Sequence, residues 1–214
     1  MTDGTTWLAA PQAIAFGGYH VVLARGLSVD ELADRLAAIL HGGKHVVVPV
    51  GEHTGDSLLE LMDDTYGGVF DGIGLRLGRF DDWTYAVAYG GWPGEFDPVG
   101  PISHGGAHVF LLEYEEENGK PVPPQFAAFH DGRLLSSFNL HLDSSWGYQG
   151  VDGDPATAAR LQERLTAAGL PDPERDRWEV HRAALGVIDE FFGLSLPQDT
   201  VVNGSLPAVL LELA

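Results

Sequence analysis

The sequence feature that most constrains the fold is residues 72–91, where apolar and polar residues alternate on both sides of a short polar connection. The alternating apolar residues are Ile73, Leu75 and Leu77 in the first arm and Trp83, Tyr85, Val87 and Tyr89 in the second. A period of two on both sides of the four-residue connection 79–82 predicts an antiparallel β-hairpin. The other face of the second arm carries Thr84, Ala86 and Ala88, which are small enough for a helix or a second sheet to approach. We therefore expect both faces of the hairpin to be covered and the hairpin to lie at the centre of a sheet.

Other stretches of strand length precede and follow this hairpin. The expected strands cover 19–24, 45–50 and 107–114, and a second hairpin covers 125–140. The run 45–50 is apolar and predicts a buried strand closed by Pro49 and Gly51. In the second hairpin, Asp131 and Gly132 favour a type I′ turn, because both central residues of that turn need positive φ.

The clearest helical signal is a capping box at Ser28 and Glu31. In this motif the serine hydroxyl accepts a bond from the backbone of the glutamate, and the carboxylate accepts one from the backbone of the serine. An apolar stripe at helical spacing follows, and Gly42 ends it. The sequence therefore predicts a helix over 28–41.

The period changes from two to three or four in the last third of the chain. Asp154 is expected to cap a helix that ends at Gly169, and an apolar stripe that begins at Trp178 predicts a longer helix that ends at Gly193. A second box pattern at 57–60 predicts a short helix through Met62, and the apolar tail 206–213 is expected to dock on the domain. Residues 1–214 are thus predicted to form one α+β domain. It has a mostly antiparallel β-sheet, an early capped helix and two C-terminal helices packed on one face.

Composition limits the classes of protein that this chain can belong to. An apolar fraction of 44% in 214 residues is ample for a substantial core. No apolar run is long enough to predict a membrane span, and the first residues lack the basic and apolar regions of a signal peptide. The chain has no cysteine, which excludes disulfides, thiolate nucleophiles and thiolate metal sites. A cytoplasmic protein with no membrane association is expected.

Charge is the one global anomaly. The chain has 12 Lys and Arg against 31 Asp and Glu, a net charge of −19. Between Glu52 and Glu117 the only basic residues are Arg76 and Arg79. Such a field repels nucleic acids and attracts a basic protein partner. The alternative explanation is that the charge serves solubility alone.

Histidines are the main lead toward chemistry, because the glycine and serine motifs of nucleotide-binding and hydrolytic enzymes are missing. His104 and His108 are separated by three residues and could be metal ligands, as imidazole suits a divalent ion. His141, with Asp143, could join them from another loop. The alternative is that these histidines are structural and hydrogen-bonded at the ends of the sheet. We interpret His181, on an apolar helical stripe, as a core residue rather than a catalytic base, and no cofactor is predicted.

Acidic pairs and loop tryptophans are the candidates for an interface. The residues are Asp63, Asp64, Asp81, Asp82, Trp92 and Trp146. The acids could instead be ordinary solvated loop residues, because adjacent side chains in a turn point apart. Trp92 and Trp146 lie in glycine-rich loops, where an exposed tryptophan can be an interface hot spot. Together with Trp83 and Tyr148, they could also line a pocket or close the open ends of the sheet.

Four segments in a fixed order carry a family resemblance. They are 26–32, 78–86, 131–138 and 184–194. In this order they resemble an uncharacterised bacterial family of the actinobacterial type, in which an LS-x-DEL helix precedes a G-x-W-x-A strand, an Asp-Gly hairpin and a helical close. The resemblance covers most of the chain from Trp7 and implies the same α+β fold. It implies no catalytic residue, because that family has no established activity.

Two functional hypotheses follow from the sequence. The first is an acidic protein-interaction module that neutralises or regulates a basic protein partner, as in bacterial immunity or defence. It depends on the acidic stretch, the loop tryptophans and the missing catalytic motifs. The second is a small-ligand-binding protein or an enzyme, with a His and Asp cleft between the sheet and the closing helices that could hold a metal.

Overall fold

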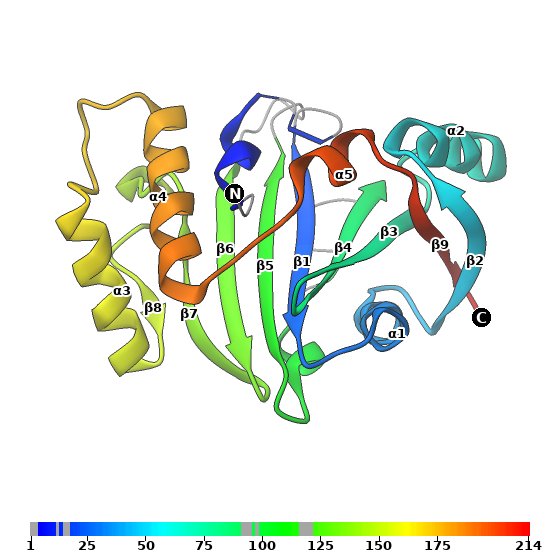
Figure 1. The fold of residues 1–214 in the computed structure, drawn as a ribbon, viewed down its shortest axis with the longest axis horizontal. Helices are drawn as coiled ribbons and strands as arrows, with labels where there is room; N and C mark the ends of the chain where they lie inside the picture. The colour runs from blue at the N-terminus through cyan, green and yellow to red at the C-terminus, as the bar shows by residue number, and fades with distance from the viewer. Residues whose placement is uncertain (1–3, 12, 15–17, 91–95, 97–98, 116–121) are drawn as a thin grey trace.

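The computed structural model describes residues 4–11, 13–14, 18–90, 96, 99–115 and 122–214. Its strands form one nine-stranded sheet with the order β2-β9-β3-β4-β1-β5-β6-β7-β8, and all neighbouring strands are antiparallel (Figure 1). The strands are β1 (Tyr19–Arg25), β2 (His45–His53), β3 (Ile73–Phe80), β4 (Trp83–Gly90), β5 (His108–Glu115), β6 (Val122–His130), β7 (Arg133–Asn139), β8 (Asp152–Gly153) and β9 (Leu206–Leu213). The predicted α+β class is confirmed.

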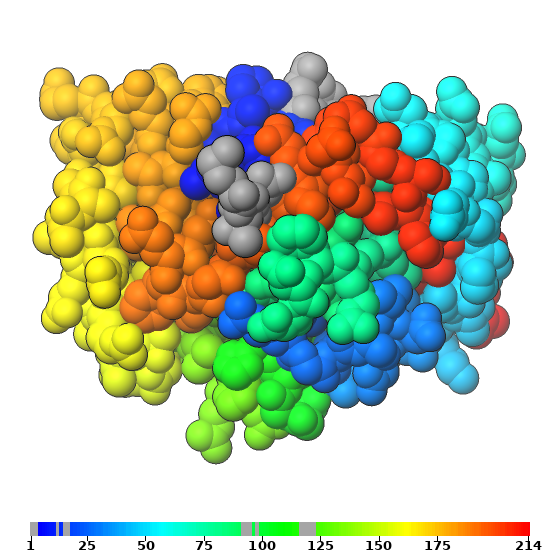
Figure 2. Space-filling model, in the orientation of Figure 1, coloured from blue at the N-terminus to red at the C-terminus, as the bar shows by residue number. Residues whose placement is uncertain are grey.

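Helices cover both faces of this sheet. The α-helices are α1 (Val29–Ile39), α2 (Gly55–Tyr66), α3 (Pro155–Ala167), α4 (Arg177–Phe192) and α5 (Gln198–Asn203), and the short 3₁₀ helices are η1 (Thr6–Ala9), η2 (Gly100–Ser103) and η3 (Ser144–Trp146). Strand β1 separates two cores, because Val21 and Leu23 pack in one with residues of α2–α5, while Val22 and Ala24 pack in the other with residues of α1. In the space-filling view, α4, α5 and the segment between them lie over the middle strands of the sheet, and α3 lies to the left of α4 (Figure 2). The early helix therefore does not share a face with the two C-terminal helices.

The predicted first hairpin is present as β3 and β4. Phe80 pairs with Trp83, and Asp81 has a φ of 51°, so the connection has two residues rather than the four expected. The small face of β4 receives α1 as predicted, and the Thr84 hydroxyl donates a 2.8 Å hydrogen bond to the carbonyl of Leu27. The hairpin lies in the interior of the sheet, but the middle strand is β1.

The second hairpin and the helix caps follow the sequence closely. Asp131 and Gly132 both have positive φ, 48° and 77°, between β6 and β7. At α1, both bonds of the capping box between Ser28 and Glu31 are made. Asp154 caps α3 by accepting a bond from the backbone of Thr157. Local backbone chemistry alone accounts for these turns and caps, which is why they are readable from sequence.

Three expectations need correction. The strand expected over 45–50 is not buried, because β2 is the edge strand of the sheet, where Pro49 costs no ladder bond. Helix α2 is capped by Thr54 rather than Ser57 and runs on to Tyr66. The tail 206–213 does more than dock, since it forms β9 between β2 and β3.

Arg76 is the largest charged side chain in the core, with 0% of its surface exposed. It lies on β3, and its guanidinium reaches four acceptors. They are the carbonyls of His53, Val201 and Gly204 and the hydroxyl of Tyr89. These bonds join β2, β4 and α5, so the charge is solvated by oriented dipoles instead of water.

Candidate functional site

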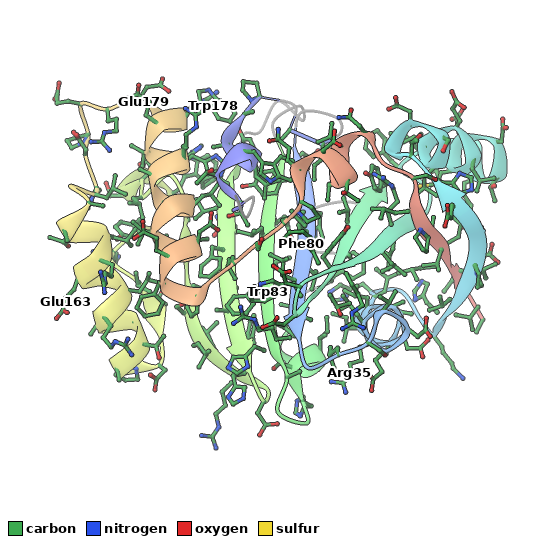
Figure 3. All side chains as sticks on the ribbon, in the orientation of Figure 1. Arg35, Phe80, Trp83, Glu163, Trp178 and Glu179 are labelled. Atoms are coloured by element: carbon green, nitrogen blue, oxygen red, sulfur yellow. The ribbon has the colours of Figure 1, made fainter. Side chains whose placement is uncertain are left out.

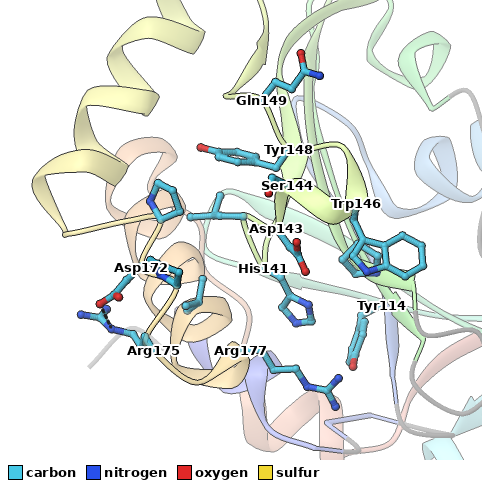
Figure 4. Close-up of a pocket in the computed structure, with 15 residues that line it drawn as sticks. Tyr114, His141, Asp143, Ser144, Trp146, Tyr148, Gln149, Asp172, Arg175 and Arg177 are labelled. Atoms are coloured by element: carbon cyan, nitrogen blue, oxygen red, sulfur yellow. Dashed lines mark ion pairs between the residues drawn. The ribbon is translucent and has the colours of Figure 1, made fainter.

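A pocket lies at the end of the sheet where β5 ends, β6 begins and β7 ends (Figure 4). Its walls come from the loop after β7 and from the connection between α3 and α4. We call it the end pocket and define it by Tyr114, His141, Trp146, Tyr148, Arg175 and Arg177, which all line it. Its volume is about 710 Å³, in the range of sites that hold small organic molecules.

The loop after β7 is held in place by its own polar side chains. The Asn139 carboxamide oxygen accepts a 3.0 Å bond from the backbone of Asp143, and the Asp143 carboxylate accepts a 2.7 Å bond from the backbone of Ser145. These bonds start η3, which carries Trp146 to the rim of the pocket with 51% of its surface exposed. The Tyr148 hydroxyl donates a 3.0 Å bond to Gln162 on α3, which fixes the second aromatic wall.

Two arginines lie on the helical side of the end pocket. Nε of Arg175 lies 3.6 Å from a carboxylate oxygen of Asp172, and both side chains are about one third exposed. Arg177 extends its guanidinium below His141, toward the hydroxyl end of Tyr114 (Figure 4). The lining thus contains two arginines and two aspartates, Asp143 and Asp172, in a chain whose net charge is −19.

His141 brings an unsatisfied polar atom to the lining. Its Nε2 is buried and has no hydrogen-bond partner in the part of the chain that the structure describes. Burial, followed by the nearby charge of Arg177, lowers the pKa of His141 to about 4. The imidazole is therefore neutral at pH 7 and offers one nitrogen as a donor or an acceptor.

An aromatic cluster backs His141. Its ring centroid lies 5.6 Å from that of His181, 6.0 Å from that of Tyr114 and 6.4 Å from that of Trp178. Trp178 lies in the first turn of α4, at the same end of the molecule (Figure 3). His181 is fully buried, and burial lowers its pKa to about 3. The interpretation of His181 as a core residue agrees with this placement.

The other two predicted metal ligands lie at the opposite end of the strands. His108 begins β5 and stacks on His130 with ring centroids 4.0 Å apart, and His104 precedes it in the chain. Because β7 runs from Arg133 beside this pair to Asn139 at the other end, His141 is a strand length away from it. Among the described residues, no three His, Asp or Glu side chains gather as a metal ion requires.

The predicted interface residues do not form one surface. Asp63 and Asp64 are exposed on α2, before β3 begins, whereas Asp81 and Asp82 are exposed in the turn after β3 ends. Trp146 lies at the end pocket, beyond β7. Trp92 lies outside the described residues. Of the other aromatic candidates for a pocket, Tyr148 lines it and Trp83 is a buried core residue.

Sequence reasoning missed the helical side of the end pocket. Arg175 and Arg177 follow the Pro171 and Pro173 break, which signals only a connection between helices. Tyr114 belongs to an apolar strand and gives no sign of facing a cavity. The clustered arginines were the one available signal, because basic residues are scarce in this chain.

The chain matches no protein-family model, and neither curated proteins nor solved structures give a match. The resemblance to an uncharacterised bacterial family therefore stays a prediction. No helix in the described ranges has the length and apolar character to cross a membrane. The function has to be argued from the geometry of the site.

Proposed function

We propose that this chain binds a small organic ligand in the end pocket. The observation that carries the proposal is Nε2 of His141, which is buried, has no hydrogen-bond partner among the described residues and lies at the wall of a cavity of about 710 Å³. A buried polar atom without a partner costs about 1–3 kcal/mol, and a ligand that bonds to it recovers part of this cost. Pockets that bind small molecules typically have aromatic walls and a few polar groups that converge on the ligand.

Parts of the pocket wall are already held in place by hydrogen bonds, which supports ligand binding. Tyr148 is fixed by its bond to Gln162, and the loop around Asp143 is fixed by backbone bonds. Binding to walls that are already ordered loses less conformational entropy than binding that orders them.

A thermal-shift and NMR screen of metabolite mixtures tests the proposal. At least one compound is expected to raise the Tm of the wild type and to lose that effect in His141→Gln and Trp146→Ala. The matched control is His104→Gln, because His104 is exposed and lies at the other end of the strands. A screen in which no compound depends on His141 or Trp146 would contradict the proposal.

We also propose, as a second candidate, binding of a basic protein partner through α2. Asp56, Glu60, Asp63 and Asp64 are all exposed on this helix, and the spacing places them along one side. Helix α2 contains no Lys or Arg, so nothing on the helix itself neutralises the stripe. A stripe of this kind speeds the encounter with a basic surface.

Pull-down from a native lysate at two salt concentrations tests this second candidate. A partner is expected to bind the wild type at low salt and to bind less at high salt. It should be lost when the four α2 acids are changed to Asn or Gln. The matched control neutralises Asp81 and Asp82, which are equally exposed but lie at the other end of β3. Two results would contradict binding through α2. One is a partner that binds equally at both salt concentrations, and the other is a partner that is lost equally in both variants.

A further inference from the structure

The end pocket has charges that restrict its ligand further, and this step rests on the proposed function. Five of the 12 basic residues lie between positions 160 and 182, and two of these, Arg175 and Arg177, line the pocket. Arginine offers five N–H donors in a planar fork that matches a carboxylate or a phosphate. The same stretch also holds five acids, and the lining has two aspartates beside its two arginines, so these guanidinium groups offer a local cationic site and not a net positive field.

The two carboxylates of the lining are already bonded within their own loops. Asp143 accepts from the backbone of Ser145 at 2.7 Å, and this bond helps to lower its pKa. Asp172 accepts from the backbone of Glu174 at 3.1 Å and pairs with Arg175. Both acids hold loop geometry, whereas the contact of Arg175 with Asp172 uses only Nε of its fork.

The remaining walls select the body of the ligand. Trp146 at the rim and Tyr148 across the pocket present flat rings, and His141 lies between them and Arg177 (Figure 4). A planar ligand can stack on such rings in offset or edge-on contact. The neutral imidazole of His141 then faces the part of the ligand that joins its aromatic body to its charged end.

We infer that the ligand of the end pocket carries an acidic group, a carboxylate or a phosphate, on a flat aromatic body. Arg177 and Arg175 bind the acidic group, Trp146 and Tyr148 contact the body, and His141 exchanges a hydrogen bond with a polar atom of the ligand. The arrangement rejects the neutral analogue, because an uncharged group forms weaker bonds with guanidinium than an anion does.

Calorimetric titration with three probes tests this inference. The probes are indole-3-propionate, its neutral amide indole-3-propionamide, and phenyl phosphate. An acid, carboxylate or phosphate, is expected to bind about tenfold more tightly than the amide, equivalent to about 1.4 kcal/mol. The acid that binds more tightly then shows whether the acidic group of the ligand is a carboxylate or a phosphate.

Variants of Arg177 provide the specificity control. In Arg177→Gln the preference for the acid over the amide is expected to disappear, and in Arg177→Lys a large part of it should remain, because the charge is kept. Arg79→Gln is the matched control, since Arg79 is exposed at the far end of β3. Far-ultraviolet circular dichroism confirms that each variant is folded.

Two results would overturn the inference. One is equal binding of acids and amide by the wild type, or binding of none of the three probes. The other is an acid preference that survives in Arg177→Gln and in the double variant with Arg175→Gln. Either result leaves the proposed function standing if the metabolite screen finds a neutral ligand that depends on His141. The proposed function itself fails when no compound in that screen depends on His141 or Trp146.

Discussion

The hydroxyl of Tyr19 lies 2.7 Å from Nε2 of His181, and this bond joins the middle strand of the sheet to α4 inside the core. Burial raises the pKa of Tyr19 well above its usual value, so the hydroxyl keeps its proton. Burial also lowers the pKa of His181 to about 3, so the ring is neutral. The bond therefore joins two uncharged groups, and the tautomer of His181 sets which of them donates.

Removal of the Tyr19 hydroxyl should destabilise the fold. Tyr19→Phe leaves Nε2 of His181 buried without its partner, which costs about 1–3 kcal/mol of unfolding free energy. Urea denaturation at pH 7 measures the change. Tyr66→Phe is the matched control, since the Tyr66 hydroxyl has no partner among the described residues and should change stability by less than about 0.5 kcal/mol. Equal effects of the two variants would contradict the assigned bond.

Acid should destabilise the protein through its two buried histidines. The pKa values of His141 and His181 in the folded state, about 4 and about 3, lie below the ordinary 6.5 of the unfolded chain. The unfolded state therefore binds more protons below pH 6.5, and stability falls as pH drops toward 4 and 3. His181 alone should cost on the order of 2 kcal/mol between pH 6.5 and 4.5. Urea denaturation at these two pH values measures the loss.

The carboxyl group of Asp189 on α4 should oppose this loss, because it makes the fold more stable as pH falls. Its carboxylate accepts bonds of 2.7 and 2.6 Å from the backbone and hydroxyl of Thr5, and burial raises its pKa to about 6 from 3.8. A raised carboxyl pKa adds stability at low pH that is lost as pH rises through 6. The unfolding free energy lost between pH 6.5 and pH 4.5 should therefore be larger in Asp189→Asn than in the wild type. An unchanged or smaller loss in Asp189→Asn would contradict this sign.

Arg76 should be the most sensitive charged position. Arg76→Met removes the donors of three backbone carbonyls and of the Tyr89 hydroxyl. Because these acceptors are in the interior or at its border, we expect a loss of about 3 kcal/mol in unfolding free energy. The matched control is Arg79→Met, which lies three residues along the same strand and is exposed. A loss below about 1 kcal/mol would show that water replaces the guanidinium.

Two glycines should respond to alanine in opposite ways. At Gly74 a Cβ would lie 2.8 Å from the sulfur of Met62, so Gly74→Ala should overpack the contact of β3 with α2 and cost about 1–3 kcal/mol. In the middle of α4, a Cβ at Gly186 would meet only Thr6, at 3.7 Å. Gly186→Ala should stabilise the protein by about 0.5–1 kcal/mol, because glycine is a poor helix former. Thermal unfolding of both variants measures the contrast.

Features set by neighbours in sequence were predictable. The capping box of Ser28 and Glu31 and the turn of Asp131 and Gly132 depend on a few consecutive residues, and both form as expected. The alternation of large and small residues after Trp83 likewise indicates that both faces of β4 are covered. Such signals are local, so no knowledge of the remaining chain is needed.

Features set by distant pairing were not predictable. Pro49 closes a strand by propensity, but β2 continues past it because it is an edge strand whose one neighbour among the described residues is β9, far away in the sequence. The end pocket shows the same limit. The sequence identifies His141 as a candidate ligand, but its place near Arg177 depends on how α4 docks against the sheet.

The place of β9 has a consequence for how the chain reaches its fold. Strand β2 is made early but pairs only with β9, and β3 gains its second neighbour from the same strand. Without residues 206–213, β3 is an edge strand of a smaller sheet, and β2 lacks the one strand that it pairs with among the described residues. This half of the sheet can therefore assemble only after residues 206–213 are made, and their removal would expose the unpaired edge of β3 to other chains.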